Sequence, residues 1–192
     1  MGTSIVILAG GQSRRMGRDK LRLTLSGEAL LERALRRFSA EFDRVRVSTG
    51  DPERYPELGS RRIFDRYPGA GPLAGLHAAL AETGEDVFLV GGDMPLASPE
   101  AAKKLIALAG DCDACVLTDA EGRWEPLFGF YRQRILPEAE ALLREGKNSM
   151  AGLLKRLKLR EAALSEIGET ADLLRNVNDP AEYAKLCLEL GE

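Results

Sequence analysis

The sequence contains one histidine and few aromatic residues, which make up 6% of its 192 positions. With His77 as the single histidine, the chain has no Ser/His/Asp or Cys/His set for nucleophilic catalysis, and we expect His77 to be a satisfied packing residue. The low aromatic content, the lack of an RNP-like aromatic run and a net charge of −3 argue against nucleic-acid binding. Catalysis by a histidine-activated nucleophile and nucleic-acid recognition are therefore both disfavoured.

The three cysteines do not have the number or the spacing of a disulfide framework. Cys112 and Cys115 have the C-x-x-C spacing of a redox pair or of half a zinc site, but the sequence has no second cysteine pair and one histidine. We therefore expect both to be small apolar residues at the start of a buried strand.

Long apolar runs are also missing. The run from Ile5 to Ala9 is too short for the core of a signal peptide or for a membrane span. We therefore expect a cytoplasmic protein without a membrane partner. A hydrophobic fraction of 44% and a charged fraction of 30% suit a packed core with a polar surface, and the length predicts one domain over residues 1–192.

Apolar and turn-forming segments alternate along the chain. The run from Thr3 to Leu8 has the continuous apolar character of a strand buried on both faces of a parallel sheet. Strands and helices that alternate in this way predict an α/β fold with a mostly parallel open sheet and helices on both faces. Further strands are expected over 44–49, 61–65, 87–90, 113–117 and 125–132, and helices over 28–39, 72–83, from 98 onward, over 135–145, over 149–158 and from 179 to about 190.

Three polar features follow predicted strands: a glycine-rich loop after Leu8, then Asp65 and Asp93. Ligands of open α/β sheets bind beyond the carboxyl ends of the strands, so this placement marks a candidate site. The two glycines before Asp93 are expected to leave open space beside it, where the carboxylate would hold Mg²⁺. Asp93 can also be explained as a turn aspartate, and Asp65 as an ordinary start of a loop.

The loop LAGGQSRRMGRDK, residues 8–20, matches neither the P-loop nor the dinucleotide-binding pattern. Its chemistry still suits phosphate. Gly10 and Gly11 permit close approach of backbone amides, while Arg15 and Lys20 can neutralise a polyphosphate. The alternatives are a sharp turn with solvated cations and a basic arm. Together with the two aspartates, the loop suggests phosphoryl or nucleotidyl transfer.

The same loop resembles the L-A-G-G-x-S-x-R-M-G-x-D-K signature of the molybdenum cofactor guanylyltransferases at every fixed position. Other segments resemble that family in the same order. They are FDRYPGAGPLAGL (64–76), LVGGDMPL (89–96), EPLFGFY (125–131) and NVNDPAEY (176–183).

This resemblance implies a Rossmann-like nucleotidyltransferase fold and transfer of GMP from Mg·GTP to the terminal phosphate of molybdopterin, with release of pyrophosphate. It also implies molybdoenzymes or their chaperones as partners. Arg15, Lys20 and Asp93 would be catalytic, with Asp93 holding Mg²⁺. The resemblance implies GTP contacts for Leu8, Ala9, Gly10, Gly11, Lys20, Asp65 and Asp93, and a molybdopterin side formed by Asn176, Asn178 and Ser149.

Two positions depart from the family pattern. Gly92 replaces the usual Cys, which is expected to be harmless because the neighbouring carboxylate carries the charge. The segment VSTGD (47–51) lacks the Asn that the family often has near guanine. A CTP-dependent molybdopterin cytidylyltransferase or another small nucleotidyltransferase is therefore an alternative. The non-enzymatic alternative is a nucleotide-binding sensor or a cofactor-delivery module.

Overall fold

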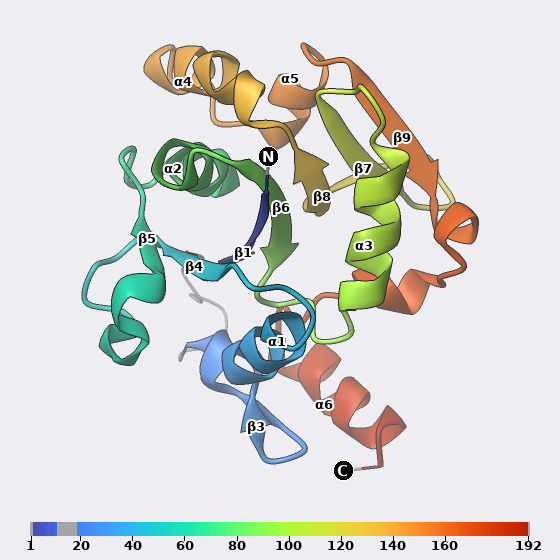
Figure 1. The fold of residues 1–192 in the computed structure, drawn as a ribbon. Helices are drawn as coiled ribbons and strands as arrows, with labels where there is room; N and C mark the ends of the chain where they lie inside the picture. Colours follow the sequence, from blue (N-terminus) through green and yellow to red (C-terminus); the bar gives the residue numbers. More distant parts are fainter. Residues whose placement is uncertain (1, 11–18, 192) are drawn as a thin grey trace.

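A seven-stranded sheet forms the middle of the computed structural model, which describes residues 2–10 and 19–191 (Figure 1). Its strand order is β5-β4-β1-β6-β8-β7-β9. Neighbouring strands from β5 to β6 are parallel, β8 is antiparallel to both β6 and β7, and β9 is parallel to β7. The prediction of a mostly parallel open sheet is confirmed. The strands are β1 (Thr3–Leu8), β4 (Val45–Thr49), β5 (Arg62–Phe64), β6 (Asp86–Gly91), β7 (Ala114–Thr118), β8 (Trp124–Tyr131) and β9 (Leu159–Ala163).

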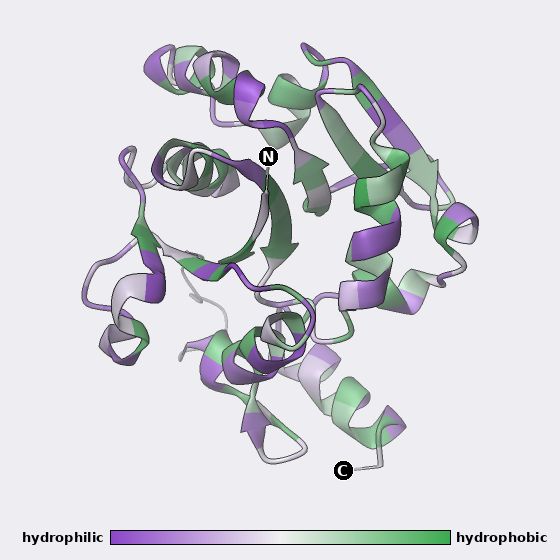
Figure 2. Cartoon of the chain, in the orientation of Figure 1, coloured by the Kyte–Doolittle hydropathy of each residue, from purple (hydrophilic) through white to green (hydrophobic). Residues whose placement is uncertain are grey.

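Helices cover both faces of the sheet. Side chains of β1 alternate between the faces: Ile5 and Ile7 belong to the core that includes residues of α1 and α3, and Val6 belongs to the core on the α2 side. Figure 2 shows β6 as an apolar strand between these layers. The first layer has α1 (Leu30–Ser39) and α3 (Pro99–Leu108), and the second has α2 (Pro72–Thr83), α4 (Leu136–Arg144) and α5 (Met150–Leu154).

The last helix, α6 (Pro180–Glu189), packs away from the sheet. Its Leu186 joins Leu23, Leu25, Leu30 and Val177 in a third, smaller apolar cluster. This cluster attaches the C-terminal segment to the region that follows the glycine-rich loop. Short 3₁₀ helices complete the chain: η1 (Lys20–Arg22), η2 (Pro56–Arg61), η3 (Gln133–Ile135), η4 (Leu164–Ile167) and η5 (Ala171–Leu174).

Some elements differ from the prediction. The expected helix over 28–39 begins at Leu30, because Glu28 and Ala29 form β3 and pair with β2 (Thr24–Leu25). Ser26 and Gly27 between them have φ of 53° and 76°, the left-handed values that a two-residue hairpin turn requires. The expected helix over 149–158 ends at Leu154, since the chain continues into β9 at the edge of the sheet.

Within residues 2–10 and 19–191, the two cysteines with C-x-x-C spacing belong to no group of three or more side chains that could hold a metal. Cys115 lies fully buried in β7, and burial raises the pKa of its thiol to about 12. Cys112 is partly buried, and both are free thiols. Separately, none of the helices in residues 2–10 and 19–191 has the length and apolar character needed to cross a membrane.

Candidate functional site

The carboxyl ends of β1, β4 and β6 meet at one edge of the sheet, because these strands are neighbours and parallel. Two backbone hydrogen bonds continue the pairing just beyond the strands. The Ala9 amide donates to the Ser48 carbonyl at 2.8 Å, and the Gly92 amide donates to the Leu8 carbonyl at 3.0 Å. The residues that follow these strands are therefore brought together.

Lys20, Asp93 and Asn178 converge at this edge from three distant parts of the chain. The Lys20 Nζ lies 2.5 Å from Asp93 Oδ2 and also donates to Asn178 Oδ1 at 3.3 Å. The side chains of Lys20 and Asp93 are 16% and 20% exposed, so the pair is partly desolvated but can still be reached by a ligand. A cation, a carboxylate and an amide thus share one position beside the glycine-rich loop.

The C-terminal segment reaches this position through its backbone. The Val177 amide donates to the Asp93 carbonyl at 2.9 Å, which places Asn176 and Asn178 on either side of that contact. Glu182 in the first turn of α6 accepts from the Asn178 amide at 2.6 Å, while Asp179 caps the helix by accepting from Ala181 and Glu182. Asn176 is partly buried and Asn178 is exposed. The cap therefore also fixes the backbone of Asn178.

The space expected beside Asp93 is filled. Gly91 and Gly92 are buried, and a Cβ at Gly91 would lie 2.9 Å from Asp93 Oδ1. A Cβ at Gly92 would lie 2.7 Å from the Leu8 carbonyl oxygen and 3.0 Å from Leu21 Cδ1. The two glycines permit close packing and do not open a void. Glycine fits at position 92 because any side chain there would meet the Leu8 backbone, and the expectation that Gly92 is a harmless replacement for Cys stays a prediction.

Gly10, Gly50 and Asp65 form the other half of the site. A Cβ at Gly10 would lie 3.3 Å from the Gly50 nitrogen and 4.0 Å from Asp65 Oδ2, and a Cβ at Gly50 would lie 3.4 Å from the same Oδ2. Ser48 donates to Asp65 Oδ1 at 3.2 Å. Burial raises the pKa of Asp65, and the Ser48 hydrogen bond only partly offsets this effect. A partly buried carboxyl thus lies beside two glycines, Gly10 and Gly50.

Helix α2 packs against this half of the site. Gly75 faces the strand ends, where a Cβ would lie 2.6 Å from Leu8 Cδ2 and 3.0 Å from Ser48 Oγ. The segment that resembles G-P-L-A-G-L therefore packs a helix backbone closely against Leu8 and against the hydrogen-bond partner of Asp65.

The structure does not bring every predicted site residue together. Ser149 caps α5, accepting from the Gly152 amide at 3.1 Å, and Figure 1 shows α5 beside α4 and far from α6. Gly11 and Arg15 lie outside the described residues. His77 is buried as expected, but its Nδ1 has no hydrogen-bond partner within residues 2–10 and 19–191, so it is not satisfied.

Sequence reasoning missed Glu125, which begins the EPLFGFY segment on β8. Burial raises the pKa of its carboxyl, the Leu127 amide that donates to it at 2.9 Å lowers it, and nearby Asp93 raises it further. The signal available in the sequence was an acid at the start of an apolar strand. Asp19 and Tyr55 were also missed, and their contacts are described below.

The donor set at this edge can hold a hard divalent ion only together with a ligand. The described part of the chain has no group of three or more His, Cys, Asp or Glu side chains suited to a metal. Mg²⁺ commonly takes one or two protein carboxylates and completes its shell with phosphate oxygens and water. Asp93, partly exposed beside Lys20, fits that role.

Comparison with known proteins agrees with this geometry. The sequence pattern of the MobA-like NTP transferase domain matches residues 5–162. A protein of Synechococcus elongatus with the name "Probable molybdenum cofactor guanylyltransferase" is 36% identical over 98% of this chain and 100% of its own length. A relative of the same name from Carboxydothermus hydrogenoformans is 34% identical over 95% of this chain and 94% of its own length.

A solved structure shows the same fold. The molybdopterin-guanine dinucleotide biosynthesis protein A of Archaeoglobus fulgidus superimposes with a TM-score of 0.84 at 26% identity, covering 97% of this chain and 99% of its own. Sequence, fold and the polar edge of the sheet thus agree, and the chain belongs to the family of MobA-like NTP transferases, together with the molybdenum cofactor guanylyltransferases.

Proposed function

We propose that this nucleotidyltransferase transfers GMP from GTP to the terminal phosphate of molybdopterin. An oxygen of that phosphate forms a bond to the α-phosphorus of GTP, the bond from that phosphorus to the bridging oxygen breaks, and pyrophosphate leaves. The product is molybdopterin guanine dinucleotide. Names of relatives that are 34–36% identical over nearly the whole chain support this choice of substrates.

The nucleotide occupies the edge formed by β1, β4 and β6 in this proposal. Leu8, Ala9 and Gly10 bring backbone close to GTP, and Asp65 accepts a hydrogen bond from it. Asp65 suits this role because its carboxyl is already desolvated, with Ser48 as its hydrogen-bond donor. Gly11 and Arg15, outside the described residues, are proposed as a further GTP contact and as a catalytic cation respectively.

Lys20 stabilises the negative charge that builds up on the triphosphate during transfer. Its Nζ is held by a carboxylate and an amide oxygen just beyond the carboxyl ends of the strands, where the triphosphate is proposed to bind. Arg15 is proposed to supply a second cation for the triphosphate.

Enzymes of this family generally act with a divalent metal, and we propose Mg²⁺ held by Asp93. When bound, Mg²⁺ would neutralise charge on the triphosphate. Asp93 would hold the metal when it binds, and Lys20, which lies beside Asp93, would contact the phosphates.

The acceptor lies on the side of Asn176 and Asn178. These amides flank the hydrogen bond from Val177 to Asp93, so molybdopterin bound there would present its phosphate to the reacting centre. Ser149 remains a predicted contact of the same substrate. Molybdoenzymes or their chaperones are proposed as recipients of the product, and the cytoplasm as the location.

The convergence of Lys20, Asp93 and Asn178 carries this proposal. It brings two residues proposed to contact GTP, Lys20 and Asp93, next to Asn178, which is proposed to contact molybdopterin. The test is pyrophosphate release. We expect release only when protein, Mg²⁺, GTP and molybdopterin are all present, and a dinucleotide product in the same reaction. Slow release that does not depend on molybdopterin would contradict the proposal.

A non-catalytic nucleotide-binding module is the alternative of another class. It predicts that GTP binds without any pyrophosphate release. The same assay therefore separates the two functions.

A further inference from the structure

Tyr55 has an unusual backbone for an aromatic residue. It precedes η2 with φ 53° and ψ 49°, in the left-handed region that bulky side chains rarely adopt. Its side chain is nevertheless buried, with 2% of the residue exposed. Such a conformation costs free energy and persists only where the surroundings hold it, and it is often found at functional sites.

The Tyr55 hydroxyl contacts the residue before the catalytic lysine. It donates to Asp19 Oδ2 at 2.6 Å, and the Arg54 guanidinium lies 2.8 Å from the same oxygen and donates to the Tyr55 hydroxyl at 2.9 Å. The other oxygen of Asp19 accepts from the Leu21 amide at 3.1 Å and caps η1. One carboxylate therefore joins the segment after β4 to the turn that carries Lys20.

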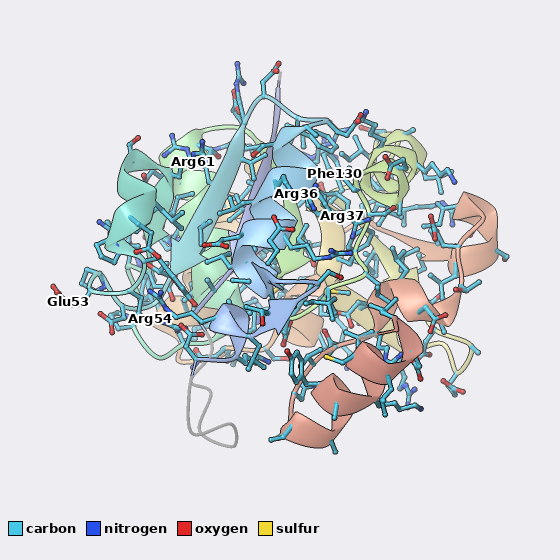
Figure 3. The ribbon with its side chains drawn as sticks, turned by 90° about the horizontal axis from the view of Figure 1, so that it is seen from below. Arg36, Arg37, Glu53, Arg54, Arg61 and Phe130 are labelled. Carbon is cyan, nitrogen blue, oxygen red and sulfur yellow. The ribbon has the colours of Figure 1, made fainter. Side chains whose placement is uncertain are left out.

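The Tyr55 ring contacts the other end of that turn. The Arg22 guanidinium lies 5.3 Å from the ring centre, and Arg54 lies 5.0 Å from it. Figure 3, seen from the side of α1, labels Arg54 on the segment after β4. Tyr55 thus holds η1 at Asp19 through its hydroxyl and at Arg22 through its ring, with Lys20 between them.

We propose that Tyr55 is a positioning residue for Lys20, acting through Asp19. The proposal rests on the proposed function, because it assigns to the segment after β4 the task of holding the lysine that contacts the triphosphate. The same segment begins at Gly50, beside Asp65. It therefore connects the nucleotide side of the site to the lysine at its centre.

The ionisation states needed for this contact are stable at neutral pH. Burial, followed by the hydrogen bond to Asp19, raises the pKa of Tyr55 far above its ordinary value, so the phenol keeps its proton. Burial raises the pKa of Asp19, but the hydrogen bonds from Tyr55 and Arg54 outweigh it and hold the pKa below its usual value. A neutral donor thus faces a charged acceptor.

The test is a double-mutant cycle with Tyr55→Phe and Asp19→Asn. Tyr55→Phe keeps the ring and its stacking but removes the hydroxyl, and we expect kcat to fall about tenfold with little change in the KM for GTP, because a misplaced catalytic group slows the reaction. If Tyr55 acts through Asp19, the double variant is no slower than Asp19→Asn alone. The proposal would be overturned if the kcat losses of the two single variants multiply in the double variant, or if Tyr55→Phe leaves kcat unchanged.

Two controls separate positioning from a general loss of stability. Tyr67→Phe removes a hydroxyl that lies 3.4 Å from Glu140, on the side of the sheet that α2 and α4 cover, and should keep the wild-type kcat. Ser98→Ala removes the cap of α3 and should lower the thermal unfolding temperature without lowering kcat. A kcat loss in Ser98→Ala as large as that in Tyr55→Phe would assign the effect to stability and overturn the proposal.

A second measurement needs no turnover. Acylation of lysines by a succinimidyl ester, followed by peptide mass spectrometry, reports how firmly each ammonium is held. We expect Lys20 to react several-fold faster in Tyr55→Phe than in the wild type, with Lys103 and Lys158 unchanged as internal references. An unchanged Lys20 rate would refute the positioning role. If the wild type transfers no GMP while Lys20 responds as expected, the proposed function fails and the positioning role stands.

Discussion

Lys20 and Asp93 are 73 positions apart in the chain and form an ion pair with 2.5 Å between Nζ and Oδ2. The pair brings the end of the glycine-rich loop to the end of β6. Asn178 accepts from the same ammonium, so the last helical segment is joined to it as well. This arrangement holds a carboxylate and a cation side by side just beyond the end of β6.

Lys20→Met should lower kcat/KM for GTP about 10²- to 10³-fold, the usual loss when a preorganised donor to developing charge is removed. Methionine preserves the length and apolar stem of the side chain without the ammonium. Steady-state pyrophosphate release measures the effect. Lys20→Arg is the matched control, which keeps the charge in a planar group and should recover only part of the rate. Wild-type kinetics in Lys20→Met would rule out its role.

Asp93→Asn should raise the Mg²⁺ concentration needed for half-maximal activity and lower the maximal rate, because an amide is a weaker ligand for a hard cation than a carboxylate. Titration of activity with Mg²⁺ measures both effects, and GTP binding without Mg²⁺ should be little changed. Asp111→Asn, on an exposed carboxylate paired with Lys158, is the control and should titrate like the wild type. Equal Mg²⁺ curves for Asp93→Asn and the wild type would remove Asp93 from the metal site.

Gly75→Ala should reduce the free energy of unfolding by about 1–3 kcal/mol, the range for overpacking a tight contact. Its new methyl group would press on Leu8 and Ser48. Gly152→Ala is the matched control in another helix, where the nearest atom to the Cβ is at an ordinary 3.4 Å, and it should gain about 0.5–1 kcal/mol from helix propensity. Urea unfolding compares the two, and equal effects would contradict the close approach of α2.

His77 is the single histidine of the chain, and it makes the free energy of unfolding depend on pH below about 6.5. Burial lowers its pKa from the ordinary 6.5, with Arg66 and Arg144 adding to the effect and Glu140 opposing it. Below pH 6.5 the unfolded chain therefore binds a proton that the folded chain excludes, and the free energy of unfolding falls until the folded-state pKa is reached.

The slope due to His77 is at most about 1.4 kcal/mol per pH unit for one proton. Urea unfolding at several pH values between 7.5 and 5.5 measures it. In His77→Met this part of the slope should disappear, and an identical pH dependence in the variant and the wild type would contradict the burial of a neutral imidazole.

Local sequence signals were enough to predict most of the fold. The apolar run from Thr3 to Leu8 is strand β1, and Ser98 and Asp179 cap helices where the sequence places them. Strand β9 was missed because it lies at the sheet edge and is only partly buried, so its residues carry a weak apolar pattern. What defines β9 is its pairing with β7, which is a long-range contact.

The candidate site could be predicted in part for the same reason. Asp65 and Asp93 follow strands, and that position alone marked them as candidates. The meeting of Lys20 with Asn178 depends instead on the backbone contact from Val177 to Asp93, which has no signature in the sequence. The left-handed backbone of Tyr55 is equally hidden, because nothing in a tyrosine predicts that conformation.

Gly91 and Gly92 show how a correct position can receive the wrong explanation. They lie beside the carboxylate as expected, but neighbouring atoms fill the space that a side chain would need. Only the tertiary packing, with Asp93 and Met94 beside Gly91 and with Leu8 and Leu21 beside Gly92, distinguishes a void from a close contact.

The most direct test of the account is a competition between equimolar GTP and CTP, with Mg²⁺ and molybdopterin, in which the mass of the dinucleotide identifies the nucleotide transferred. The segment VSTGD (47–51) lacks the asparagine that the family resemblance leads us to expect near guanine, so this competition tests the choice of base directly. The account predicts molybdopterin guanine dinucleotide as the main product. Cytosine dinucleotide as the main product would contradict it.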